Sequence, residues 1–132
     1  MNRIYLKTTQ KKQVLDITLD VNDFLAKQSM ESGLCYLFLT HTTAALATAD
    51  MDPGTDLDTL DYLAKLGEGI KFRHPHDPSH ATDHINSSVI GPSLILPFEA
   101  RKLVLGQWQK VVLIELYGPK DREIIASTIA AT

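Results

Sequence analysis

The histidines of this 132-residue chain are concentrated in one short stretch. Residues 73–84 read RHPHDPSHATDH and hold four of the five histidines, namely His74, His76, His80 and His84. His80 and His84 are spaced for one face of a helix, and His74 and His76 for one side of an extended segment. Either spacing can bring two imidazoles to one metal ion, most often zinc. Because two prolines interrupt the stretch, the spacing by itself favours a solvated polar loop.

The fifth histidine, His41, stands in LFLTHTTAAL, where an apolar run changes to small residues. Hydroxyls of Thr40, Thr42 and Thr43 flank it. The end of a buried strand is a rigid platform for a functional side chain. The segment alone leaves two interpretations open, a site residue or a core histidine held by a backbone carbonyl.

Two carboxylates stand in settings that suggest a role. Glu115 lies inside the apolar run VVLIEL, so it must be paired or protonated if it is buried. Arg122 is a candidate partner for it, or alternatively a contact for an anion. Asp83 precedes His84 and could orient that imidazole or cap a helix.

Other polar groups have simpler explanations. The acidic stretch 50–58 could bind a cation, but it more simply places negative charge on the first turn of a helix. Trp108 is the sole tryptophan, and packing explains it more simply than ligand binding. The chain has no GxGxxG, Walker or GxSxG motif, so nucleotide binding or serine hydrolysis by those routes is not indicated.

These residues must be positioned by a chain that is rich in strands. Alternating or continuous apolar runs predict strands over 3–9, 13–19, 34–39, 44–49, 93–98, 102–106, 108–118 and 122–130. The run 34–39 is expected to be buried on both faces. One helix is expected to start at Asp20 and stop by Gly33, and a second to run from Pro53 to Gly67. The predicted fold is α+β, a largely antiparallel β-sandwich flanked by about two helices, in a single domain over 1–132.

Composition limits the class of protein. Hydrophobic residues make up 44% and charged residues 22%, proportions typical of a globular domain. The net charge of −3 argues against a nucleic-acid partner, and no apolar run is long enough for a membrane span. The first residues turn polar at once, unlike a signal peptide. The single cysteine, Cys35, is expected to be buried and inert, and the expected location is the cytoplasm.

Several short motifs follow one another in a fixed order, namely HTTAAL at 41–46, Asp-Pro at 52–53, His74, DHINSSVIGPS at 83–93, LVLGQWQ at 103–109 and IELYGP at 114–119. Together they resemble the motifs of the YjbQ-like family, a group also described as secondary thiamine-phosphate synthases. The resemblance covers roughly residues 3–130. It implies an α+β domain, usually a homotrimer, with a polar pocket near the family's histidines.

The resemblance also implies which residues form the site. His41, His74 and His84 match family histidines and become the proposed triad and metal ligands, whereas His76 and His80 become loop residues outside the site. His41 and His84, with Glu115 and Asp83, are the proposed catalytic groups. The proposed ligand contacts are Ser87, Ser88, Arg122 and Trp108.

The chain departs from the family pattern at places that concern phosphate. Asn86 stands where the family has a lysine, and Lys120 follows Gly118-Pro119 where the family has an arginine. The acidic stretch before Asp52 is shorter, which weakens a match between Asp50 and the family's glutamate.

Three functions are therefore carried forward. The first is a weak thiamine-phosphate synthase-like transferase acting on phosphorylated small molecules. The second is a hydrolase assisted by a zinc-like divalent metal at the three histidines, whereas magnesium with a phosphate substrate would belong to the first. The third is a trimeric module that binds a small molecule without turnover.

Overall fold

The computed structural model describes residues 1–74 and 78–132. Strands dominate this part of the chain, and three α-helices and a short 3-10 helix, η1, accompany them. In chain order the elements are β1 (Asn2–Lys7), β2 (Gln13–Asp16), α1 (Thr18–Ala26), β3 (Gly33–Leu39), β4 (Ala44–Ala49), α2 (Thr55–Lys65), η1 (Pro78–His80), α3 (Ala81–Ile90), β5 (Ser93–Glu99), β6 (Lys102–Leu103), β7 (Lys110–Glu115) and β8 (Asp121–Ile129).

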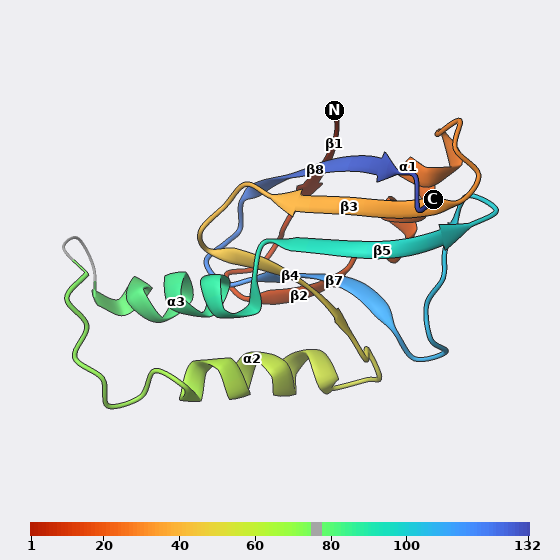
Figure 1. Cartoon of the computed structure of the whole chain (residues 1–132). Coiled ribbons are helices and arrows are strands. Elements are labelled where there is room, and N and C mark those ends of the chain that lie inside the picture. Colours follow the sequence, from red (N-terminus) through yellow and green to blue (C-terminus); the bar gives the residue numbers. More distant parts are fainter. Residues whose placement is uncertain (75–77) are drawn as a thin grey trace.

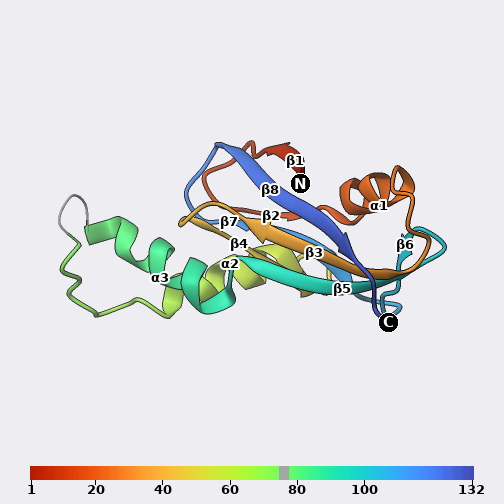
Figure 2. The same cartoon turned by 45° about the horizontal axis from the view of Figure 1, so that its top comes forward.

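The strands form two antiparallel sheets. One has the order β1-β8-β3-β5-β6 and the other the order β2-β7-β4. The smaller sheet lies between the larger sheet and helix α2, and α3 extends beyond one end of the sheets (Figures 1 and 2). The antiparallel α+β fold class predicted from the sequence is confirmed.

Strand β7 is buried on both faces along most of its length. Val111 and Leu113 belong to the main apolar core between the sheets, and Val112 and Ile114 to a second cluster that includes Leu63 of α2. The prediction that 34–39 is buried on both faces is wrong. In β3 burial alternates, because α2 covers the three-stranded sheet and the described part of the chain leaves the outer face of the larger sheet uncovered.

Helix α1 begins and ends earlier than predicted. It starts at Thr18, whose backbone N–H and hydroxyl donate to the carboxylate of Asp16 at 3.0 and 2.7 Å. Asp20 therefore lies in the first turn instead of capping the helix. The helix ends at Ala26, and Gly33 begins β3 instead of stopping the helix.

Helix α2 begins at Thr55, two residues after Pro53, because Gly54 adopts a left-handed conformation (φ 95°). Only part of its predicted apolar stripe faces inward, with Leu60 and Leu63 in the second cluster and Leu57 and Leu66 exposed. The helix covers a single sheet face, so a narrow stripe is sufficient. Within the described residues, no helix is long and apolar enough to cross a membrane.

Helix α3 replaces the latter part of the predicted histidine-rich loop. Its buried side chains are mostly polar, namely Asp83, Asn86 and Ser87. Asn86 Nδ2 donates to the carbonyl of Leu63 at 3.0 Å, and Ser87 Oγ to that of Ala44 at 2.6 Å. A helix that buries polar groups has no clear apolar stripe, which explains why the sequence pattern did not reveal it.

Candidate functional site

A buried ion pair lies at the end of the main core, between the two sheets. Glu115 is 0% exposed and Arg122 is 2% exposed. Arg122 Nε donates to Glu115 Oε1 at 2.9 Å, and Nη2 donates to Oε2. The expected pairing of Glu115 with Arg122 is confirmed. β7 and β8 hold these two residues, so regular strands fix the position of the pair.

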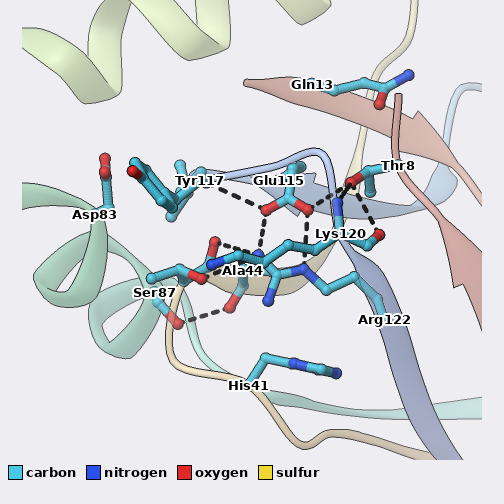
Figure 3. Close-up of polar contacts among 12 residues, drawn as sticks. Thr8, Gln13, His41, Ala44, Asp83, Ser87, Glu115, Tyr117, Lys120 and Arg122 are labelled. Carbon is cyan, nitrogen blue, oxygen red and sulfur yellow. Dashed lines mark hydrogen bonds and ion pairs between the residues drawn. The ribbon is translucent and has the colours of Figure 1, made fainter. Parts of the chain in front are cut away.

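Two further groups complete the surroundings of Glu115 (Figure 3). Thr8 Oγ1 donates to Oε1 at 2.7 Å, and the backbone N–H of Tyr117 donates to Oε2 at 3.2 Å. Burial by itself would raise the pKa of Glu115, but the hydrogen bonds from Arg122 and Thr8 and the charge of Arg122 bring it below its ordinary value. Glu115 is therefore an ionised anchor for Arg122 and not a free base.

The guanidinium of Arg122 has one edge left for a ligand. Nη2 also donates to the carbonyl and hydroxyl of Thr43 at 3.1 and 3.0 Å. Nη1 makes no hydrogen bond to residues 1–74 or 78–132, yet no buried polar side-chain atom there lacks a partner, so Nη1 reaches accessible space. In Figure 3, His41 lies on the side of the guanidinium opposite Glu115.

His41 lies just beyond the end of β3 and is held in one tautomer. Its Nε2 accepts a hydrogen bond from the backbone N–H of Glu123 at 2.9 Å, so the proton of the neutral ring is on Nδ1. Burial, followed by the charge of Arg122, lowers the pKa of His41 from its ordinary value. A neutral imidazole at neutral pH follows, with its N–H available as a donor.

Helix α3 and the segment before it bring the other histidines to the same place. His84 Nδ1 lies 3.1 Å from the carbonyl of Thr42, which makes Nδ1 the donor and leaves a lone pair on Nε2. The rings of His74 and His84 are stacked, with centroids 5.1 Å apart and an interplanar angle of 18°. The ring of His80 contacts Tyr117 edge-on at 3.9 Å between centroids.

These side chains line a cavity of about 490 Å³, here called the polar pocket. Its lining residues are Thr40, His41, Thr42, Thr43, His74, His80, His84, Tyr117, Lys120 and Arg122. The ammonium of Lys120 lies 4.7 Å from the centroid of the Tyr117 ring. Among the residues that the structure describes, the lining has cationic side chains and imidazoles and no carboxylate, so this part of the pocket is suited to an anion.

A second cavity, here called the apolar pocket, adjoins the polar pocket and has a volume of about 640 Å³. Its lining residues are Phe38, Leu39, Thr40, His41, Thr42, His84, Ser87, Ser88 and Pro92. Four of them, Thr40, His41, Thr42 and His84, also line the polar pocket. Ser87 and Ser88, expected as ligand contacts, thus lie beside the histidines.

The proposed triad converges on one pocket, but its rings are not arranged as metal ligands. Across residues 1–74 and 78–132, no group of three or more His, Cys, Asp or Glu side chains is placed to hold a metal ion. Nearly parallel rings such as those of His74 and His84 direct their nitrogens along separate lines, whereas an ion needs them to converge at about 2.1 Å. The arrangement is therefore not a formed metal site.

Some residues expected in the site lie elsewhere. Asp83 does not orient His84, because its carboxylate accepts from Lys12 Nζ at 2.7 Å and is absent from the lining of both pockets. Trp108 is 66% exposed and lines a separate small hollow with Asp50 and other residues, away from the histidines. The same hollow includes Asp52, so the acidic stretch does not reach the polar pocket.

Two histidines, His76 and His80, were predicted to be loop residues outside the site. His80 lines the polar pocket and contacts Tyr117, so its assignment as a loop residue outside the site is wrong. His80 lies in η1, and its ring reaches Tyr117 in the connection between β7 and β8, a contact between distant segments that the sequence does not show. His76 lies outside the described residues.

Three residues that support the site were not predicted from the sequence. Thr8 and Tyr117 contact Glu115, and Lys12 holds the start of α3 through Asp83. Thr8 and Lys12 come from the first 12 residues, whose sequence indicates only a strand and a turn. Of the three, Tyr117 alone had a signal, since it lies in the IELYGP motif.

The sheet order defines a small α+β protein, and known proteins share this architecture. The sequence matches the UPF0047 protein YjbQ-like family over residues 2–131, and the chain belongs to this family. A UPF0047 protein of Archaeoglobus fulgidus is 32% identical over 127 residues, covering 94% of this chain and 97% of the relative. The UPF0047 protein YugU of Bacillus subtilis is 29% identical over 126 residues, covering 92% and 93%.

Solved structures agree with this assignment. A YbjQ-like protein of unknown function from Sulfolobus solfataricus superposes with a TM-score of 0.89 at 28% identity, covering 98% of this chain and 95% of the other. A conserved hypothetical protein from Thermus thermophilus gives a TM-score of 0.87 at 32% identity, covering 98% and 100%. These relatives establish the family and the fold, and their names state no activity.

Proposed function

We propose that the polar pocket binds a small phosphorylated molecule. The observation that carries this proposal is Arg122, an almost completely buried guanidinium that is fixed by Glu115 and Thr43 and keeps Nη1 for a ligand. Lys120 adds a second positive charge to the lining. A fixed guanidinium and an ammonium at one pocket form strong charge-assisted hydrogen bonds with phosphate oxygens.

The two fixed imidazoles present opposite hydrogen-bonding groups to that pocket. His41 presents Nδ1–H and is a donor, while His84 presents the lone pair of Nε2 and is an acceptor. A positioned N–H that donates to a leaving oxygen is general acid catalysis. We infer that His41 donates to the leaving oxygen and that His84 accepts a hydrogen bond from the substrate and orients it, because the nitrogen of a thiazole ring carries no proton to be removed.

The reaction proposed is the thiamine-phosphate synthase-like transfer that the family resemblance implies. In it the carbon–oxygen bond of a pyrimidine pyrophosphate breaks, a carbon–nitrogen bond to a thiazole phosphate forms, and pyrophosphate leaves. Arg122 and Lys120 would stabilise the charge on the departing pyrophosphate. The departures from the family at Asn86 and Lys120 lead us to expect a low rate.

Binding and turnover can be tested separately. Isothermal titration calorimetry with inorganic pyrophosphate should show binding to the wild-type chain, and Lys120→Gln should weaken it several-fold. Both phosphorylated precursors should then yield thiamine phosphate above the level seen with His84→Ala. Undetectable pyrophosphate binding would disprove the anion site, whereas binding without product above the His84→Ala level would leave a non-catalytic binding module.

A divalent metal at His41, His74 and His84 is a separate proposal. It is supported by the convergence of the three side chains on the polar pocket, although the stacked rings of His74 and His84 would have to rotate. Elemental analysis of protein prepared without chelators should then find close to one zinc per chain, lost in His74→Ala. A metal-free preparation that also fails to take up zinc would disprove it.

We also propose that the chain forms the homotrimer implied by the resemblance. The outer face of the five-stranded sheet supports this, since Tyr5, Ile95 and Ile129 are exposed there and no described element covers them. Exposed apolar patches of this kind often mark interfaces between subunits. Light scattering during gel filtration should give three times the chain mass, and a monomer at micromolar concentration would refute the proposal.

A further inference from the structure

Strand β4 pairs with β7 along one edge, and its other edge is satisfied only over its first half. There Ser87 Oγ donates to the carbonyl of Ala44 at 2.6 Å, and the N–H of Leu46 donates to the carbonyl of Gly91 at 3.0 Å. Because every second residue of a strand directs its backbone groups to the same side, those of Thr48 also point away from β7. Within residues 1–74 and 78–132, the N–H and C=O of Thr48 have no hydrogen-bond partner.

This open edge borders a groove between β4 and α2, here called the β4–α2 groove, with a volume of about 540 Å³. Its lining is mostly apolar and includes Leu63, Ile90 and Ile114, with Thr48 at one side and the 68% exposed ring of Tyr62 at the other. A further strand beside Thr48 would direct every second side chain to the face of the sheet that α2 covers. Those side chains would then lie on this apolar surface.

The groove is separate from the surfaces already assigned. The smaller sheet lies between α2 and the larger sheet, so subunit contacts through the outer face of the larger sheet leave the groove open (Figures 1 and 2). In the part of the chain that the structure describes, the groove also shares no lining residue with the polar pocket or the apolar pocket.

The rim of the groove on α2 is acidic. Asp58 lines the groove, Asp61 follows three residues later and so lies on a neighbouring part of the helix surface, and both are exposed. Neither forms an ion pair with another described residue. Asp58 also lies in the first turn of α2, where it favours the helix dipole, but Asp61 lies beyond that turn. The rim therefore complements a partner with lysine or arginine side chains.

We propose that the open edge of β4 accepts an extended, basic segment of another protein as an additional strand. Main-chain hydrogen bonds to the N–H and C=O of Thr48 hold this segment, its apolar side chains occupy the β4–α2 groove, and its lysine or arginine side chains lie near Asp58 and Asp61. In strand addition the backbone supplies affinity and the pockets for alternate side chains supply specificity. This interaction surface is independent of the proposed phosphate site.

Calorimetry with a capped octapeptide tests the proposal. Valine and threonine alternate over its central residues, and a pair of lysines stands at each end. N-methylation of one set of alternate central amides should weaken binding by about tenfold or more, and methylation of the other set should not, because only every second amide faces the neighbouring strand. Hydrogen exchange of the Thr48 amide, followed by NMR, should slow when the unmodified peptide binds.

Two pairs of variants locate the binding surface. Tyr62→Ala should weaken peptide binding several-fold, and Leu57→Ala is its control, since Leu57 is exposed on the same helix but absent from the groove lining. Asp58→Asn should weaken binding and make it less sensitive to salt, whereas Asp56→Asn, in the same turn but outside the lining, should not. All four variants should bind pyrophosphate as the wild type does.

The proposal is overturned if the octapeptide does not bind, or if both sets of methylated amides bind as well as the unmodified peptide. Equal effects of Tyr62→Ala and Leu57→Ala would likewise exclude the β4–α2 groove as the binding surface. A Thr48 amide that is already protected from exchange without peptide would show that a second copy of the chain covers the edge, and would also overturn the proposal. Loss of binding confined to one methylated set, together with slower exchange at Thr48, is the result expected.

Discussion

Replacing Glu115 with glutamine should destabilise the protein far more than the change of one atom suggests. Oε1 accepts from Thr8 Oγ1 and Arg122 Nε, and Oε2 accepts from Arg122 Nη2 and the N–H of Tyr117. In Glu115→Gln one of these oxygens becomes an NH₂ group. In either orientation of the amide, the two groups that donated to the replaced oxygen now face the NH₂ group, which is itself a donor. The buried guanidinium of Arg122 also loses its counter-charge.

The magnitude follows from these contacts. A hydrogen bond to a charged group contributes about 1.5–3 kcal/mol, so the loss of two costs about 3–6 kcal/mol. Breaking a buried ion pair by removing one charge costs about 3–5 kcal/mol, which agrees with that figure. We therefore expect the free energy of unfolding of Glu115→Gln to fall by about 3–5 kcal/mol.

Urea denaturation monitored by the fluorescence of Trp108 measures this change. The matched control is Glu123→Gln, which removes a carboxylate of β8 whose partner, Arg3, is also partly exposed. Surface pairs contribute about 0–1 kcal/mol, so the control should remain within that range of the wild type. If Glu115→Gln lost no more stability than Glu123→Gln, the argument that the buried pair anchors the site would fail.

The same pair predicts how stability depends on pH. The pKa of Glu115 is lowered in the folded protein, whereas in the unfolded chain it returns to about 4.3. At a pH between the folded and the unfolded pKa of Glu115, the folded state therefore binds fewer protons than the unfolded state. The contribution of Glu115 to the free energy of unfolding is complete above about pH 4.3 and is lost as the pH falls through the folded pKa. The gap in stability between wild type and Glu115→Gln should be constant near neutrality and narrow in acid.

Three further predictions concern other groups. NMR titration should give His41 a pKa below about 6.5, and its contribution to stability should be complete above about that pH and decline in acid, because its folded pKa is lowered. Burial raises the pKa of Cys35 to about 11, so a disulfide reagent should label the native protein very slowly and the urea-unfolded protein rapidly. Lys12→Ala should lower the free energy of unfolding by about 1–3 kcal/mol in urea denaturation, because it leaves the buried carboxylate of Asp83 without its charged donor.

Each of these has a result that would contradict it. A His41 pKa at or above 6.5 would mean that the ring is not buried next to Arg122 as described. Rapid labelling of native Cys35 would show that β3 opens readily. For Lys12, the control is Lys65→Ala, which removes an exposed i,i+3 ion pair with Glu68. If the two variants lowered the free energy of unfolding equally, the Lys12–Asp83 contact would not stabilise the fold as described.

Local patterns in the sequence were enough to predict the sheets and one part of the site. Alternating or continuous runs of apolar residues indicated the eight strands that the structure describes, because such runs depend only on local burial. A carboxylate within the apolar run at 111–116 had to be paired, and Arg122 was a candidate partner seven residues later. His41 was identified as a candidate because it follows the end of a predicted strand.

Only the tertiary structure decided how these groups form one pocket. Helix α3 buries polar residues whose partners, Lys12, Leu63 and Ala44, come from three distant segments. The free edge of Arg122 likewise depends on Glu115 and Thr43, and the place of His80 on its contact with Tyr117. The physical reason is that burial of a polar group is stable only when a partner is supplied, and a one-dimensional pattern does not show which distant group supplies it.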